Sequence, residues 1–317
     1  MLAPKGTFTK IILPEEDQVS LKSLTQFELF WRRFSSNKLS VVGLIICVTM
    51  ILLAVFAPLL TPQKPDTLNS SLGFGSHAPS FSDFPWRIFG TTSGLNYSIY
   101  TQILYGARIS LFVGFAGSFI TSLIGTIVGA IAGFFGGWVD TLLSRIIDVF
   151  LSIPFLPLLI AVSAIFFHGQ NTNPLVVIGL LSIFSWPGVA RLVRSSFLSL
   201  RELEYTEAAR ATGVGTMRTI FRHLLPNAVS PIIVVSTLNV AGFILVESAL
   251  DFLGLGIDFP PVITWGNILS AAQDDLLLGD WWWPLFPGIF LVLTVLAVSF
   301  IGDGLRDAID VRSNNNA

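Results

Sequence analysis

Six apolar stretches, each long enough to cross a lipid bilayer, constrain the fold of this chain more than any other feature. A hydrocarbon core of about 30 Å requires roughly 20 apolar residues in helical form. Inside that core every backbone N–H and C=O must be paired within the protein. The stretches therefore predict an all-α integral membrane protein. We place its six transmembrane helices at residues 39–60, 109–135, 141–167, 174–193, 228–250 and 284–301.

The composition agrees with this fold class. Only 12% of the 317 residues are charged and 52% are hydrophobic, whereas a soluble domain has about 25% charged residues. The single cysteine, Cys47, lies inside the first apolar stretch, which excludes a disulfide within the chain. That stretch is longer than the apolar core of a signal peptide, so we expect it to remain as the first span.

The glycine, proline and charged residues of the second and third predicted spans indicate how these helices pack and bend. Four glycines recur at every fourth residue and would form a bare stripe on which another helix can pack closely. Pro154 and Pro157 predict a kink in the third span. Arg145 and Asp148 are three residues apart and are expected to pair near its start. The glycines of the stripe are Gly125, Gly129, Gly133 and Gly137.

Hydrophobic residues at steps of three and four predict an amphipathic helix over residues 20–38, next to the first span. Two placements are open for it: on the membrane surface, or packed only against protein. A further short helix over residues 99–109 is expected to lie at the membrane interface and to lead into the second span.

The distribution of basic residues predicts which side each connection occupies. Fifteen Lys and Arg residues fall in the two termini, residues 191–222 and the turn after the second span, and three fall in the alternate connections. The positive-inside rule therefore predicts cytoplasmic termini. The resulting organisation is a cytoplasmic N-terminus with an amphipathic helix (1–38), a first span (39–60), an extracytoplasmic loop (61–108), a five-span core (109–306) and a cytoplasmic tail (307–317).

The polar interval 204–227 interrupts the apolar half of the chain and falls on the predicted cytoplasmic side. Strong helix formers open it, Gly213 and Gly215 break it, and a second helical piece follows. Two short helices around a glycine turn bury little surface by themselves. We expect this interval to be held by a partner protein.

Motifs that would supply energy or catalysis are missing from the sequence. It contains no GxxxxGK[ST], HExxH or GxSxG pattern, and its three histidines are scattered. The ionisable residues of the spans, Arg145, Asp148 and Glu247, fall near span ends, whereas an ion-driven carrier would place several deep in the membrane. The chain therefore reads as a non-enzymatic membrane subunit driven by another protein.

The polar interval resembles the EAA signature of permease subunits of bacterial ABC importers, through Glu207-Ala208-Ala209, Gly213, Ile220 and Leu225-Pro226. Further runs are similar to the C-type permease of the dipeptide, oligopeptide and nickel group. These runs lie at residues 104–111, 223–227, 252–256, 260–261, 265–266 and 302–307. One run departs from that group: residues 89–97 lack the Asp and the Arg-Asp that members commonly carry before the second span.

The resemblance implies a type I ABC importer permease fold with an N-terminal amphipathic helix, in a bacterial inner membrane with both termini cytoplasmic. It also implies a heterodimer with a sister permease, two cytoplasmic ATP-binding cassette subunits and an extracytoplasmic solute-binding protein. Membrane lipid surrounds such a subunit, and nucleic acid is not a partner. ATP and Mg would be bound by the ATPase subunits, so no cofactor is expected in this chain.

The resemblance and the interval together predict an ATPase-coupling loop at 199–226. Its candidate residues are Glu204, Glu207, Ala208, Ala209, Arg210, Gly213, Arg218, Arg222 and Pro226. Polar residues within otherwise apolar spans are candidates for the translocation path, with hydrogen bonding between helices as the alternative. They are Ser163, Ser185, Ser236, Asn239 and Glu247. For Glu247 a carboxylate satisfied by neighbouring polar groups is a further alternative.

The expected solute is a di- or oligopeptide. The alternatives are a nickel chelate or another small solute carried by the same machine, a secondary transporter that works alone, and a membrane scaffold or receptor that transports nothing.

Overall fold

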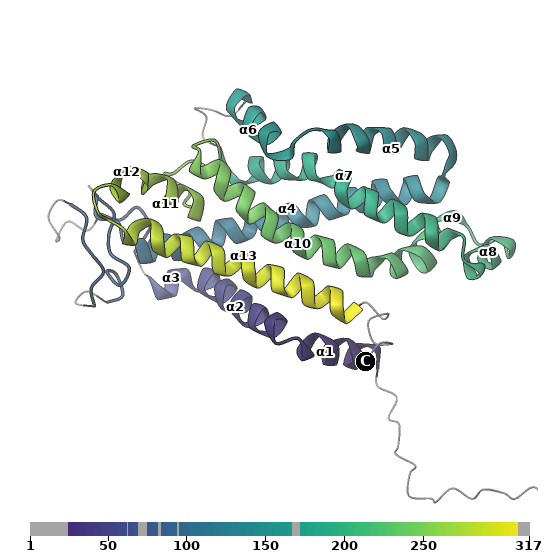
Figure 1. Ribbon diagram of the computed structural model, residues 1–317, viewed down its shortest axis with the longest axis horizontal. Helices are drawn as coiled ribbons and strands as arrows, with labels where there is room; N and C mark the ends of the chain where they lie inside the picture. Colours follow the sequence, from purple (N-terminus) through teal and green to yellow (C-terminus); the bar gives the residue numbers. More distant parts are fainter. Residues whose placement is uncertain are drawn as a thin grey trace, which may run out of the picture.

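The long helices of the computed structural model run side by side in an elongated bundle, with short helices at both ends (Figure 1). The structure describes residues 25–61, 63–68, 75–81, 84–93, 95–166 and 172–309. The predicted N-terminus before residue 25 and the tail beyond residue 309 lie outside the described residues. In chain order the helices are α1 (Gln26–Ser36), α2 (Lys38–Val55), α3 (Ala57–Leu60), α4 (Ile99–Phe135), α5 (Gly137–Ser152), α6 (Phe155–Phe166), α7 (Pro174–Arg201), α8 (Glu204–Ala211), α9 (Thr216–Thr219), α10 (Leu225–Phe252), α11 (Trp265–Ala271), α12 (Gln273–Leu276) and α13 (Trp282–Ile309).

Five helices of the described chain are long and apolar enough to cross a membrane, and a bent pair, α5 with α6, makes a sixth if it is counted as one span. This result confirms the all-α membrane fold. The predicted helix over residues 99–109 is present as the first part of α4 and leads without a break into the second span. This segment is packed inside the protein, where Gly106 lies against the backbone of Thr264 and Trp265.

The glycine stripe of α4 packs against α7, as predicted. A Cβ at Gly125 would lie 2.5 Å from the Cβ of Val189, and a Cβ at Gly133 would lie 2.6 Å from the Cβ of Phe197. Only glycine allows the two backbones to approach so closely. Gly137 does not belong to the stripe, because α4 ends at Phe135 and Gly137 is the first residue of α5.

A proline divides the predicted third span into α5 and α6, which meet at an angle of 80°. Pro154 has no N–H to continue the helix, and its ring restricts the residue before it to extended backbone. Ile153 accordingly has φ −90° and ψ 130°. The predicted kink is confirmed as a complete break at Pro154, whereas Pro157 lies in the first turn of α6, where proline is tolerated.

The predicted amphipathic helix is present as α1, within the part of residues 20–38 that is described. Its N-terminus has a capping box between Thr25 and Glu28. Phe34 is buried beside Gly304 of α13, and the amide of Asn37 donates to the carboxylate of Asp307, 3.3 Å away. One face of α1 therefore packs on protein.

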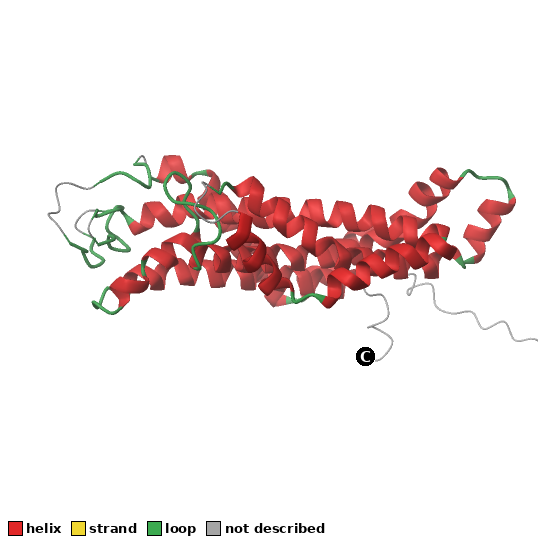
Figure 2. Ribbon diagram, turned by 90° about the horizontal axis from the view of Figure 1, so that it is seen from above, coloured by secondary structure: helices red, strands yellow, loops and turns green. Residues whose placement is uncertain are grey.

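The two ends of the bundle carry different short elements. Helices α11 and α12 and the loop that precedes α4 lie at one end, and α8 and α9 lie at the other (Figures 1 and 2). The run that departs from the permease group, residues 89–97, is held at the first end by neutral groups. The backbone of Gly90 abuts the indole of Trp282, whose Nε1 donates to the carbonyl of Thr91.

Candidate functional site

The predicted coupling loop forms α8 and α9, joined by a turn at Gly213, at one end of the bundle. Gly213 has φ +76°, a left-handed conformation that favours glycine. Glu204, Glu207 and Ala208 are exposed along α8. The side chains of Ala209 and Arg210 lie outside what the structure describes.

The α8 helix is attached to the end of α7 by a residue that sequence reasoning missed. Thr206 is fully buried, and its hydroxyl donates to the carbonyl of Leu200 at 2.9 Å. Its backbone N–H donates to the carbonyl of Leu203 at 2.8 Å. A lone threonine in an exposed polar helix was the only signal in the sequence that could have identified this contact.

Beyond α9 the chain enters α10 through a single π-helical turn, Ile220–Leu224. Pro226 explains this turn, because it cannot donate to the carbonyl four residues earlier and its ring would clash with that carbonyl. Within the turn Ile220 and Leu224 are buried against Phe197. Arg218 and Arg222 point to the surface.

Large apolar side chains are also exposed at this end, which the sequence analysis did not consider. They are Tyr205 on α8, Met217 on α9 and Phe221 in the π-helical turn. Their signal in the sequence was the spacing of four between positions 217 and 221 in an otherwise polar interval. Exposed apolar side chains among charged ones are typical of a protein docking surface.

A cavity of about 570 Å³ lies where α5 breaks, between α5, α6, α7 and α10. Its walls are mostly apolar, and Ser185 and Asn239 are among the residues that line it. The hydroxyl of Ser185 is buried and has no hydrogen-bond partner within the described chain. Two of the five predicted path residues therefore lie together at a cavity in the bundle.

The other path candidates lie away from this cavity. The hydroxyl of Ser163 donates to the carbonyl of Leu255. Ser236 lies between α10 and α4, where its hydroxyl is 2.6 Å from that of Ser122 and its carbonyl accepts from Ser118. These contacts correspond to the alternative of hydrogen bonding between helices.

Glu247 is fully buried in a network of hydroxyls at the α11 end of α10. Its two carboxylate oxygens accept from Ser110 and Ser248, each at 3.1 Å. One turn later Asp251 accepts from the N–H of Ile257 at 2.6 Å and from the hydroxyl of Thr264. This network ties α4, α10 and the loop before α11 together.

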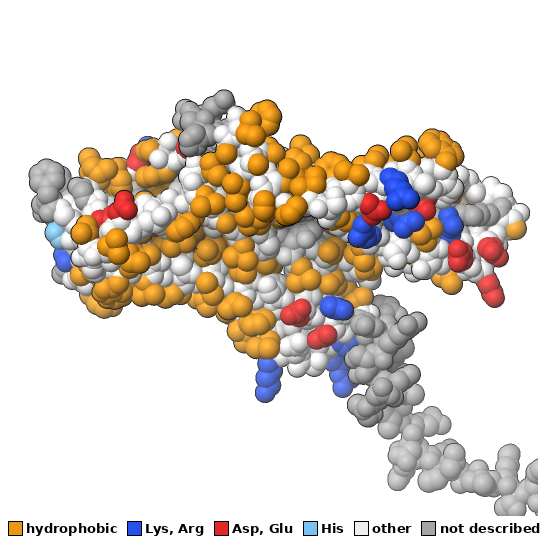
Figure 3. Space-filling view, turned by 45° about the horizontal axis from the view of Figure 1, so that its top comes forward, with side chains coloured by type: hydrophobic (Ala, Val, Ile, Leu, Met, Phe, Trp, Pro, Cys, Tyr) orange, Lys and Arg blue, Asp and Glu red, His pale blue; other side chains and the backbone are white. Residues whose placement is uncertain are grey.

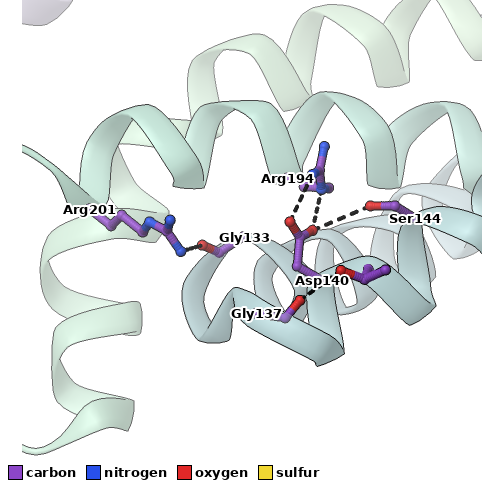
Figure 4. A network of polar contacts seen from close by, with 7 residues as sticks. Gly133, Gly137, Asp140, Ser144, Arg194 and Arg201 are labelled. Atoms are coloured by element: carbon purple, nitrogen blue, oxygen red, sulfur yellow. Dashed lines mark hydrogen bonds and ion pairs between the residues drawn. The ribbon is translucent and has the colours of Figure 1, made fainter.

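Two ion pairs join α5 to α7 near the α8 end of the bundle. Arg194 donates to both carboxylate oxygens of Asp140, which also accepts from Ser144 at 3.3 Å (Figure 4). The second pair joins Arg191 and Asp148 at 2.5 Å. The predicted pairing of Arg145 with Asp148 is therefore wrong: Asp148 is bound across the helix interface instead.

Comparison with known proteins identifies the family of the chain. Residues 125–315 match the family described as the binding-protein-dependent transport system inner membrane component. The chain belongs to this family. Residues 25–79 of this permease match the N-terminal transmembrane domain of oligopeptide transport permease C.

Two relatives are named dipeptide transport system permease protein DppC. That of Alkalihalophilus pseudofirmus is 41% identical over 297 residues, which are 94% of the permease and 93% of the relative. That of Bacillus subtilis is 38% identical over 296 residues, which are 93% and 89% of the two chains.

Among solved structures, the permease is similar to a chain of the inward-facing MetNI methionine ABC transporter, with a TM-score of 0.52 and 22% identity. The match covers 65% of the permease and 96% of that chain. It agrees with the predicted type I importer permease fold. The permease is thus a multi-pass inner membrane component of a transport system.

Proposed function

We propose that the permease is the membrane subunit of an ATP-driven importer that takes up di- and oligopeptides delivered by an extracytoplasmic binding protein. The names of the two DppC relatives support the solute class. The exposed α8–α9 unit at one end of the bundle carries the proposal of ATP-driven coupling. In this arrangement two cytoplasmic ATPase subunits bind ATP and Mg, and a sister permease completes the membrane channel.

The surface of the α8–α9 unit suits a protein partner. The side chain of Ala208 is small, so the exposed side of α8 would fit into a groove on the surface of a partner protein. Glu207 supplies a negative charge beside it. Tyr205, Met217 and Phe221 add apolar area that an ATPase subunit would bury. The concentration of basic residues at this end supports a cytoplasmic location, with both termini on the same side.

The attachment of the α8–α9 unit explains how movement there would reach the membrane. Thr206 fastens α8 to the end of α7, and the π-helical turn leads directly into α10. Both α7 and α10 line the cavity that contains Ser185 and Asn239. Closure of the ATPases would therefore shift two walls of the cavity as rigid bodies, and differential binding of ATP would drive the switch.

Two variants of the coupling unit test this proposal in the complete transporter, reconstituted with its ATPases, sister permease and binding protein. Glu207→Arg reverses a charge on the docking surface, and Gly213→Pro cannot adopt φ +76°. We expect both variants to insert in the membrane but to lose ATPase association and peptide uptake. The control is Asp274→Arg, an exposed acidic residue on α12 at the opposite end.

The outcomes separate the alternatives. Normal uptake in both variants would refute the coupling role. Uptake by the permease alone, without ATPases, would indicate a secondary transporter, and ATP hydrolysis independent of loaded binding protein would indicate a scaffold. Binding-protein-dependent uptake of a nickel chelate, but of no peptide, would retain the machine and change its solute.

A further inference from the structure

A second, polar pocket lies between α5 and α7 and has no part in the function proposed above. Its volume is about 360 Å³. Two hydroxyl groups, those of Thr141 and Ser144, line it together with five charged side chains. The charged residues are Asp140, Arg145, Asp148, Arg191 and Arg194.

This pocket lies next to the apolar cavity along α5 and α7. The cavity is lined by Leu151 of α5 and Gly188 of α7, and the polar pocket by Asp148 and Arg191, one helical turn further along each helix. Both lie between the same two helices. Figure 3 shows a cluster of basic and acidic side chains near the end that carries α8 and α9, next to a predominantly hydrophobic surface.

The two ion pairs of the pocket differ in exposure. The side chains of Asp140 and Arg194 are 17% and 29% exposed, and Ser144 adds a further bond, so this pair holds α5 on α7. The side chains of Asp148 and Arg191 are 53% and 54% exposed. Water screens such an open pair, so its mutual attraction is weak and it can be exchanged for other partners.

The pocket also has a spare positive charge. Arg145 is exposed and has neither an ion pair nor a hydrogen bond within the part of the chain that the structure describes. The pocket therefore presents carboxylates, guanidinium groups and hydroxyls within one small volume. A ligand that carries both an ammonium and a carboxylate group would match this set.

We propose that this pocket binds the charged termini of the transported peptide. Asp148 would accept the peptide ammonium, and Arg191 together with Arg145 would donate to its carboxylate, as the Asp148–Arg191 pair opens. The Asp140–Arg194 pair stays closed and keeps α5 on α7. The inference rests on the proposed peptide solute and adds a binding site on its route.

Equilibrium binding to the nucleotide-free transporter complex in nanodiscs, without binding protein, tests this site directly. The probes are radiolabelled dialanine, which carries both charges, and N-acetyl-dialanine amide, which carries neither. We expect D148N and R191Q each to weaken dialanine binding about tenfold, through loss of one charge-assisted hydrogen bond. Binding of the uncharged probe should not change. The matched control is D303N, an exposed carboxylate on α13.

Three results would overturn the site: no dialanine binding to the wild-type complex, unchanged affinity in both variants, or an equal loss for both probes, which would indicate a structural role. Binding-protein-dependent peptide uptake, measured separately on the same wild-type complex, reports on the proposed function. Uptake that persists while the binding result is negative therefore refutes the pocket alone.

Discussion

At the scale of single residues, burial separates side chains of the same type. Asp140 and Asp148 both lie on α5 and both pair with an arginine of α7, yet only the first is largely covered. Glu247 is a carboxylate within a span, and four donors, three hydroxyls and one backbone N–H, surround it and Asp251. The contribution of a charged residue in this permease therefore depends on how far its neighbours cover it.

The two ion pairs predict different effects on stability. Asp140→Asn removes the charge opposite the largely covered Arg194, and we expect a loss of about 1–3 kcal/mol, because the guanidinium keeps its charge without an ionic partner. Asp148→Asn opens an exposed pair and should cost less than about 1 kcal/mol. Thermal unfolding of the purified variants in one detergent measures both. Equal losses would contradict the difference in exposure.

At the scale of the elements, α4 and α7 form the tightest helix pair of the described bundle. Gly125, Gly129 and Gly133 bring the two backbones into contact, and Arg201 of α7 donates to the carbonyl of Gly133 at 3.2 Å (Figure 4). The end of α7 carries α8. The glycine contact therefore fixes the helix from which the coupling unit extends.

One methyl group placed in this contact should separate the helices. A Cβ at Gly129 would meet the carbonyl oxygen of Ala190 and lie 2.8 Å from the Cβ of Val193. We expect Gly129→Ala to destabilise the permease by about 1–3 kcal/mol, the usual cost of overpacking. The control is Gly179→Ala on α7, where a Cβ meets nothing within 4 Å. A variant at position 129 as stable as this control would argue against the close packing.

At the scale of the whole molecule, the bundle has two unlike ends. One end carries α8, α9 and a cluster of basic residues (Figures 1 and 3). The other end carries α11, α12 and the loop before α4. The cavity at the α5–α6 break lies between the α7 and α10 helices that connect these ends. Such a layout suits a subunit that receives movement at one end and opens at the other.

The orientation of the bundle is testable in intact cells. In a Cys47→Ala background, we expect Asp274→Cys to react with a membrane-impermeant maleimide and Thr212→Cys to react only after permeabilisation, because the positive-inside rule makes the α8 end cytoplasmic. Position 212 lies beyond α8 and position 274 on α12, both exposed. Labelling of the position-212 variant in intact cells would contradict the proposed orientation and place the α8 end outside the cytoplasm.

The fold class, the approximate spans, a bend at the prolines of the third span and the two-helix unit around Gly213 could all be predicted from the amino-acid sequence. These features depend on local properties: hydrophobic length, a missing N–H, and a backbone that only glycine adopts readily. Three-dimensional packing was needed to reveal the partner of Asp148, the complete break at Pro154, the burial of Thr206 and Glu247, and the grouping of Ser185 with Asn239 at one cavity. Each depends on contacts between residues far apart in the chain, which helix packing sets and local pattern does not encode.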